Sequence, residues 1–128
     1  MIHFSHHPRF TQELEEFIEH HCGGNTTATQ TVDYIQNLLL KHFDQNSQMF
    51  TSKHLGKAEG FDGFLVYWIH LVIPNSGLSR TQVPKAYFYK GHDSLSFLCL
   101  DSHLQNYKDA QLRKVARARL EEILEVAG

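Results

Sequence analysis

A polar run that can exchange protons follows an apolar segment in the C-terminal half of the sequence. Residues 95–100 form an apolar run interrupted by one serine, and Asp101, His103, Tyr107 and Lys108 come within the next eight residues. Imidazole and phenol groups can transfer protons, and a lysine ammonium can bind phosphate. A side chain just past the end of a strand can face a cleft. His103 is therefore the first candidate for acid–base chemistry.

Each of these residues also has a structural interpretation. His103 could be a solvent-exposed loop histidine. Tyr107 could stack on a base or donate a proton, or it could anchor the last helix to the sheet. The basic side of that helix, from Lys108 to Arg119, could bind phosphate or an acidic partner, or it could be a solvated face opposite an apolar stripe. The sequence leaves these alternatives open.

Two further basic groups precede predicted strands. Arg80 and Lys85 lie in a long link and at the start of the strand that follows it. An arginine there could bind phosphate through two N–H groups. A second group, Lys53, His54 and Lys57, precedes the central strand and could hold an RNA backbone. The alternative for both groups is ordinary solvated charge.

The ten histidines and two cysteines do not form a recognisable metal motif. The strings "HFSHHP" and "EHHC" lack a zinc spacing, and adjacent residues on a helix point in different directions. We expect surface histidines there, with incidental metal binding as the alternative, and no cofactor. His70 lies in an apolar strand and is interpreted as a buried, hydrogen-bonded structural histidine. Cys22 and Cys99 are interpreted as reduced thiols.

Length and composition indicate one globular domain over residues 1–128. The chain is 41% hydrophobic and 20% charged. It has no apolar run near the ~20 residues that span a membrane and no signal pattern at its N-terminus, so we expect a cytoplasmic protein. The net charge of −2 argues against a protein that binds nucleic acid over its whole surface. Residues 1–50 carry a charge of −4 and residues 51–128 carry +2, so a local basic face remains possible.

Hydrophobic spacing predicts a strand at residues 2–5 followed by a helical hairpin. Pro8 suits the first turn of the first helix, Gly23-Gly24 ends it, and Thr26 or Thr27 caps the second. Helices joined by so short a link should be antiparallel. The expected buried stripes are Phe10, Leu14, Phe17, Ile18 and His21 in the first helix, and Val32, Ile35, Leu39 and Phe43 in the second.

The remainder of the chain predicts a meander and a last helix. Residues 44–63 read as irregular, and strands are expected at 64–73, 85–90 and 95–101. A helix is expected at 109–126, with Arg113, Lys114, Arg117 and Arg119 on its solvated side. The order β-α-α-β-β-β-α predicts an α+β fold: an antiparallel meander with helices packed on one face.

Several stretches of this order resemble the RelE/ParE toxin superfamily of bacterial toxin–antitoxin modules. "LGKAEGFDGFLVYWIHL" is similar to the passage by which such proteins enter the sheet. "KAYFYKGHDSLSFLCLDSH" is similar to their later hairpin, and "DSHLQNYKD" to the polar stretch after it. The resemblance implies a short first strand, a helical hairpin, an antiparallel meander and a C-terminal helix.

The resemblance also implies a function. Such proteins are small cytoplasmic effectors that an antitoxin protein neutralises; the RelE branch cleaves mRNA on the ribosome, and the ParE branch acts on DNA gyrase. Metal-independent RNA cleavage needs a base, an acid and a cation that stabilises the phosphate. The catalytic candidates are His103, Arg80, Lys85 and Tyr107, and the RNA-binding candidates are Lys53, His54, Lys57 and Lys108.

The alternative function is a non-enzymatic binding module of the same fold. It would inhibit gyrase in the ParE manner or only pair with a partner. The near-neutral charge favours this alternative, and so does the absence of an unmistakable acid–base constellation.

Overall fold

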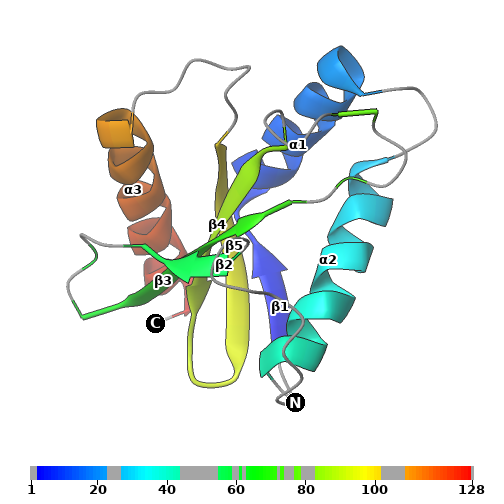
Figure 1. Cartoon of the computed structure of the whole chain (residues 1–128). Coiled ribbons are helices and arrows are strands. Elements are labelled where there is room, and N and C mark those ends of the chain that lie inside the picture. The colour runs from blue at the N-terminus through cyan, green and yellow to red at the C-terminus, as the bar shows by residue number, and fades with distance from the viewer. Residues whose placement is uncertain are drawn as a thin grey trace.

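Segments from both ends of the chain flank one five-stranded sheet (Figure 1). The computed structural model describes residues 3–22, 27–43, 55–58, 61, 63–71, 73, 77–78, 83–101 and 109–127. Its elements, in chain order, are β1 (His3–His6), α1 (Pro8–His21), α2 (Ala28–Phe43), β2 (Leu55–Lys57), β3 (Leu65–His70), β4 (Lys85–Lys90), β5 (Ser94–Asp101) and α3 (Asp109–Ala127). The α+β class is as predicted.

The sheet is mixed, with strand order β1-β5-β4-β3-β2. Strands β3 to β5 form the predicted antiparallel meander, and β2 adds a further antiparallel strand beside β3. β1 joins at the edge and runs parallel to β5, with His3 opposite Ser94 and His6 opposite Phe97. A parallel neighbour needs a long crossover connection, which the two helices and the other strands provide here.

Two strand predictions need correction. Residues 44–63 were expected to be irregular, but Leu55–Lys57 pairs with β3 as β2. Three residues are too few to show the alternation of a strand, so β2 can be identified only from its pairing with β3. The strand expected at 64–73 is shorter and covers Leu65–His70.

Helices α1 and α2 begin at the expected caps. His7 precedes α1, and Pro8 occupies its first turn. Thr27 caps α2: its hydroxyl accepts from the Gln30 backbone N–H, and the Gln30 side chain accepts from the Thr27 N–H. This reciprocal pair is a capping box. The buried residues of the two helices include most of the predicted stripes: Phe10, Leu14, Phe17 and Ile18 in α1, and Ile35 and Leu39 in α2.

The helices cover both faces of the sheet, contrary to the prediction of one covered face. Figure 1 shows α1 and α2 on one side and α3 on the other. Alternate strand positions face opposite sides, so Ile69 packs with α1 and α2 while Val66 packs with α3. The core on the α3 side consists of Phe61, Val66, Leu98, Cys99, Ala116 and Leu120.

A bulge in β5 enlarges the α3 side of the core. Phe88 pairs with Phe97 and Tyr87 pairs with Cys99, so Leu98 has no opposite residue in β4. A bulge places two neighbouring residues against one partner. Leu98 and Cys99 both belong to the α3-side core as a result.

Arg119 lies in the interior, although its helix face was predicted to be solvated. Only 7% of this residue is exposed. Its guanidinium donates to both carboxylate oxygens of Glu13 in α1, over 2.5 and 3.1 Å. It also donates to the Leu98 carbonyl at 2.9 Å. Arg119 therefore joins α3 to α1 and also binds the carbonyl of the bulged residue Leu98.

His7 is also interior, and the expectation of a surface histidine was wrong for this residue. It is 6% exposed. Its Nδ1 accepts from the Arg9 backbone N–H over 3.2 Å, so the ring proton must be on Nε2. Nε2 donates to the Glu122 carboxylate over 2.6 Å. A residue that caps α1 thus also binds α3.

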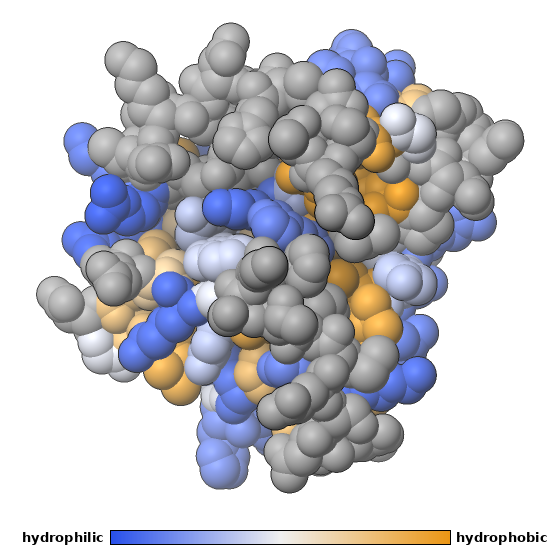
Figure 2. Space-filling model, in the orientation of Figure 1, coloured by the Kyte–Doolittle hydropathy of each residue, from blue (hydrophilic) through white to orange (hydrophobic). Residues whose placement is uncertain are grey.

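Apolar atoms reach the surface in separate patches on the face shown in Figure 2. The large apolar side chains found exposed in the described residues are Tyr34, Phe64 and Leu65. Among the described residues, no helix combines the length and apolar character needed to cross a membrane.

Candidate functional site

Two of the eight predicted site residues fall within the described part of the chain. Lys57 ends β2, and Lys85 begins β4. The other six, His103, Arg80, Tyr107, Lys53, His54 and Lys108, lie outside the described residues. The geometry of the candidate site is therefore built around the two lysines.

Lys57 and Lys85 project from opposite faces of the sheet. Lys57 is opposite Tyr67, whose side chain packs against the core under α1 and α2. Lys85 is opposite His70, which shares the parity of Val66 on the α3 side. The two lysines therefore do not form one continuous basic surface.

Lys85 lies against the tryptophan of the neighbouring strand. Its Nζ is 4.7 Å from the centroid of the Trp68 ring, within the range of a cation–π contact. Trp68 pairs with Tyr87, two residues beyond Lys85 in β4, so the contact is a diagonal one across the β3–β4 ladder. Both side chains are half-buried.

A glycine in the edge strand makes room for the Trp68 ring. Gly56 is opposite Trp68, and a Cβ added at Gly56 would lie 2.6 Å from the ring atom Cζ2. The indole therefore lies directly on the backbone of β2, which a larger residue would prevent. Packing an aromatic ring over a strand glycine in this way orients the ring and covers the glycine.

His70 completes an aromatic and basic cluster with Trp68, Lys85 and Tyr87. The His70 and Trp68 ring centroids are 5.5 Å apart, with the rings inclined by 52°. His70 was expected to be buried, but it is half-buried, as the other three are. We call these four residues the sheet-end cluster. They lie on the α3-facing side, where β3 ends and β4 begins.

Lys85 also lies beside the end of β5, the strand that precedes the polar run of residues 101–108. The last paired residue of β5, Asp101, is opposite Lys85 in the ladder. His103 follows Asp101 by two residues in the sequence, and Tyr107 by six. The row His70, Lys85 and Asp101 thus crosses three adjacent strands at one end of the sheet.

The sheet-end cluster combines aromatic, cationic and imidazole groups. Aromatic faces stack on bases, and a lysine ammonium contributes charge for a phosphate. An imidazole can donate or accept a proton. The part of the chain that the structure describes contains no group of three or more His, Cys, Asp or Glu residues that could hold a metal ion.

The sequence predicted Trp68 only as a strand residue, although its spacing from His70 indicates that the two side chains share a face. In "LVYWIH" the alternation of a strand places Trp68 and His70 on the same face. The position of Lys85 beside them required the β3–β4 register, and the role of Gly56 required the unpredicted β2. Comparisons with family models, with curated proteins and with solved structures found no match to this chain.

Proposed function

We propose that this chain is the toxin-like component of a toxin–antitoxin module, with a RelE/ParE-like architecture and RNA as its target. The observation that carries the proposal is the sheet-end cluster, in which Lys85, Trp68 and His70 gather beside the end of β5. The element order supports it as well: a short strand, a helical hairpin, an antiparallel meander and a C-terminal helix. The proposed partner is an antitoxin protein, and the proposed location is the cytoplasm.

The proposed reaction is metal-independent cleavage of mRNA, in the manner of the RelE branch. A base removes the proton of a 2′-hydroxyl, the oxygen attacks phosphorus, and an acid protonates the departing 5′-oxygen. His103 and Tyr107 are proposed for the proton transfers. Lys85 and Arg80 are proposed to stabilise the charge on the phosphate. Trp68 is proposed to stack on a base beside the cleaved bond.

A non-enzymatic role, in which the same surface binds gyrase or another protein, is the second candidate. The net charge of −2 favours it, because binding to RNA depends strongly on positive charge. The contact of Lys85 with Trp68 favours it too, since a half-buried ammonium has less freedom to follow a phosphate. In protein interfaces, aromatic residues are enriched at the centre.

Induced expression in a bacterial host distinguishes these functions. Growth and primer-extension cleavage sites on a translated mRNA would be followed for wild type, His103→Ala, Lys85→Ala and the control Lys41→Ala, which alters an exposed lysine of α2. We expect wild type to arrest growth and to produce in-frame cuts in the mRNA. His103→Ala and Lys85→Ala should both lose the arrest and the cuts, and Lys41→Ala should keep them.

The remaining outcomes each contradict part of the proposal. Arrest without cuts would replace RNA cleavage by the binding role. Cuts that persist in Lys85→Ala would remove the sheet-end cluster from the site. No arrest from a soluble, folded protein would refute the toxin function.

A further inference from the structure

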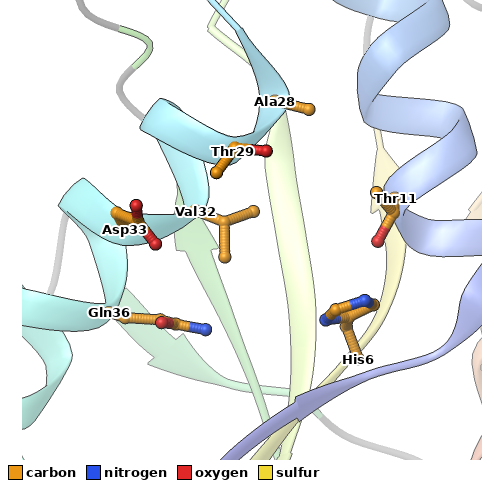
Figure 3. A pocket seen from close by; sticks show the side chains of 7 residues that line it. All are labelled: His6, Thr11, Ala28, Thr29, Val32, Asp33 and Gln36. Carbon is orange, nitrogen blue, oxygen red and sulfur yellow. The ribbon is translucent and has the colours of Figure 1, made fainter.

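A pocket of about 210 Å³ lies between α1 and α2, beside β1 (Figure 3). This is the opposite side of the sheet from the sheet-end cluster, because α1 and α2 cover the face away from α3. Its lining comes from all three elements: His6, Thr11, Ala28, Thr29, Val32, Asp33 and Gln36. It therefore lies outside the surface assigned to RNA.

A buried hydroxyl group without a partner lies beside the pocket. Thr11 Oγ1 is buried and makes no hydrogen bond. A buried polar group without a partner costs on the order of 1–3 kcal/mol, so such groups are rare and each needs an explanation. Figure 3 shows the Thr11 hydroxyl and the His6 ring on one side of the space and Val32 and Gln36 on the other.

The lining selects the chemistry of a ligand. A threonine hydroxyl, a glutamine amide and a neutral imidazole each both donate and accept hydrogen bonds. Ala28 and Val32 supply apolar surface between them. Among the lining residues that the structure describes, Asp33 is the one carboxylate, and there is no lysine or arginine. The Asp33 carboxylate disfavours an anion there, whereas an uncharged molecule with donors and acceptors around an apolar ring would find partners.

The volume limits the size of the ligand. Sites for drug-sized molecules occupy about 300–1,000 Å³, and this pocket is smaller. It suits a molecule of one or two small rings. We propose that the pocket binds an uncharged heterocycle of nucleobase size, whose ring packs on Val32 and whose edge bonds to Gln36 and His6. Rotation of the Thr11 side chain toward the space would add a bond from its hydroxyl.

Titration of ¹⁵N-labelled protein with uracil, cytosine and adenine tests the proposal. We expect saturable shifts of the backbone amides at Thr11, Val32 and Gln36 for at least one base, with a dissociation constant on the order of 1 mM. Orotate, which is uracil with an added carboxylate, should bind more weakly than uracil because of Asp33. Shifts confined to Trp68 and Lys85, or no shifts with any base, would overturn the proposal.

Two substitutions in the pocket and one outside it sharpen this test. Val32→Phe should fill the space and abolish the shifts, and Thr11→Val should weaken binding by about 3- to 10-fold through a lost hydrogen bond. Asn37→Ala, which alters an exposed residue of α2, should bind as wild type does. Undiminished binding by Val32→Phe would refute the site.

The stability of the ligand-free Thr11→Val variant provides a readout independent of binding. Valine has nearly the shape of threonine but no hydroxyl, so it removes the unpaired group from the interior. The thermal midpoint should rise by a few degrees. A lower midpoint would mean that the hydroxyl already has a partner, and this would contradict the proposal.

Discussion

The imidazole of His7 bonds to two helices at once. It accepts the Arg9 N–H at the start of α1, and it donates to Glu122 in α3. The pKa of the Glu122 carboxyl lies below its ordinary value of 4.5, chiefly because of the hydrogen bond from His7; desolvation opposes this shift, and the charges of Arg9 and Arg119 add to it. Protonation of this carboxylate would therefore weaken the link between α1 and α3.

The acid stability of the protein should depend on Glu122. A carboxyl whose pKa is lowered on folding stabilises the native state above its unfolded pKa, and this contribution is lost as the pH falls through the folded pKa. Below pH 4.5, Glu122→Gln should therefore show a smaller decline of the urea midpoint than wild type does. Unfolding at a series of pH values, with the exposed Glu121→Gln as control, measures this. Identical declines in all three proteins would contradict it.

Adding even one methyl group at Gly56 should destabilise the protein. A methyl group at Gly56 would approach the Trp68 ring to 2.6 Å, so the indole must move away from β2. Gly56→Ala should lower the free energy of unfolding by about 1–3 kcal/mol, as overpacking does. It should also shift the fluorescence of Trp68, the one tryptophan in the chain.

The control for this prediction is the same change where the ring is absent. In a Trp68→Ala background, Gly56→Ala should cost much less, because no indole remains to be displaced. Equal costs in both backgrounds would show that the glycine is required for a different reason.

At the scale of elements, α3 is attached to the sheet by polar and apolar contacts together. Ala116 and Leu120 pack on the face that contains Leu98 and Cys99. Arg119, between them on the helix, crosses to Glu13 in α1. The polar side of α3 is therefore divided: Arg113 and Lys114 are exposed, whereas Arg119 belongs to the interior.

Breaking the Arg119–Glu13 pair from either side should destabilise the protein strongly. The side chains are 9% and 17% exposed, so removing one partner leaves a largely buried charge without compensation. Arg119→Met or Glu13→Gln should cost about 3–5 kcal/mol, and the double variant should cost less than the sum of the two. Arg113→Met is the control on the exposed side. Urea unfolding of the set measures the coupling, and strict additivity would argue against the pair.

At the scale of the whole molecule, the sheet separates two cores that are covered by different helices. Cys99 is buried on the α3 side. Cys22 is half-buried at the end of α1 and packs against the other core. Neither cysteine forms a disulfide, as expected from the sequence, and the two side chains lie on opposite sides of the sheet.

The two thiols should therefore react with alkylating reagents at different rates. Burial raises the pKa of the Cys22 thiol, so its reactive thiolate is scarcer than in an open peptide. Cys22 should react slowly in the native state, and Cys99 should react only when the α3 layer opens. Mass spectrometry of iodoacetamide-treated protein, with a denatured sample as reference, measures both rates. Faster reaction of Cys99 than of Cys22 would contradict this arrangement.

The sequence by itself determined the elements whose signals are local. Pro8 and Thr27 mark helix starts through the geometry of caps, and the buried positions of α1 and α2 repeat at helical spacing. β4 and β5 were found near their observed bounds because an apolar or aromatic run on each side of a turn is also a local pattern. These features follow from the nearest few residues, so no partner segment is needed to recognise them.

Only the tertiary structure decided which residues meet across the chain. The parallel pairing of β1, the short strand β2 and the placement of α3 on the second face depend on contacts between distant segments. The same applies to the site: Lys85 was a candidate from its charge, but its position over Trp68 depends on strand register and on Gly56. Arg119 and His7 resemble surface residues in sequence, because their partners Glu13 and Glu122 lie more than a hundred positions away.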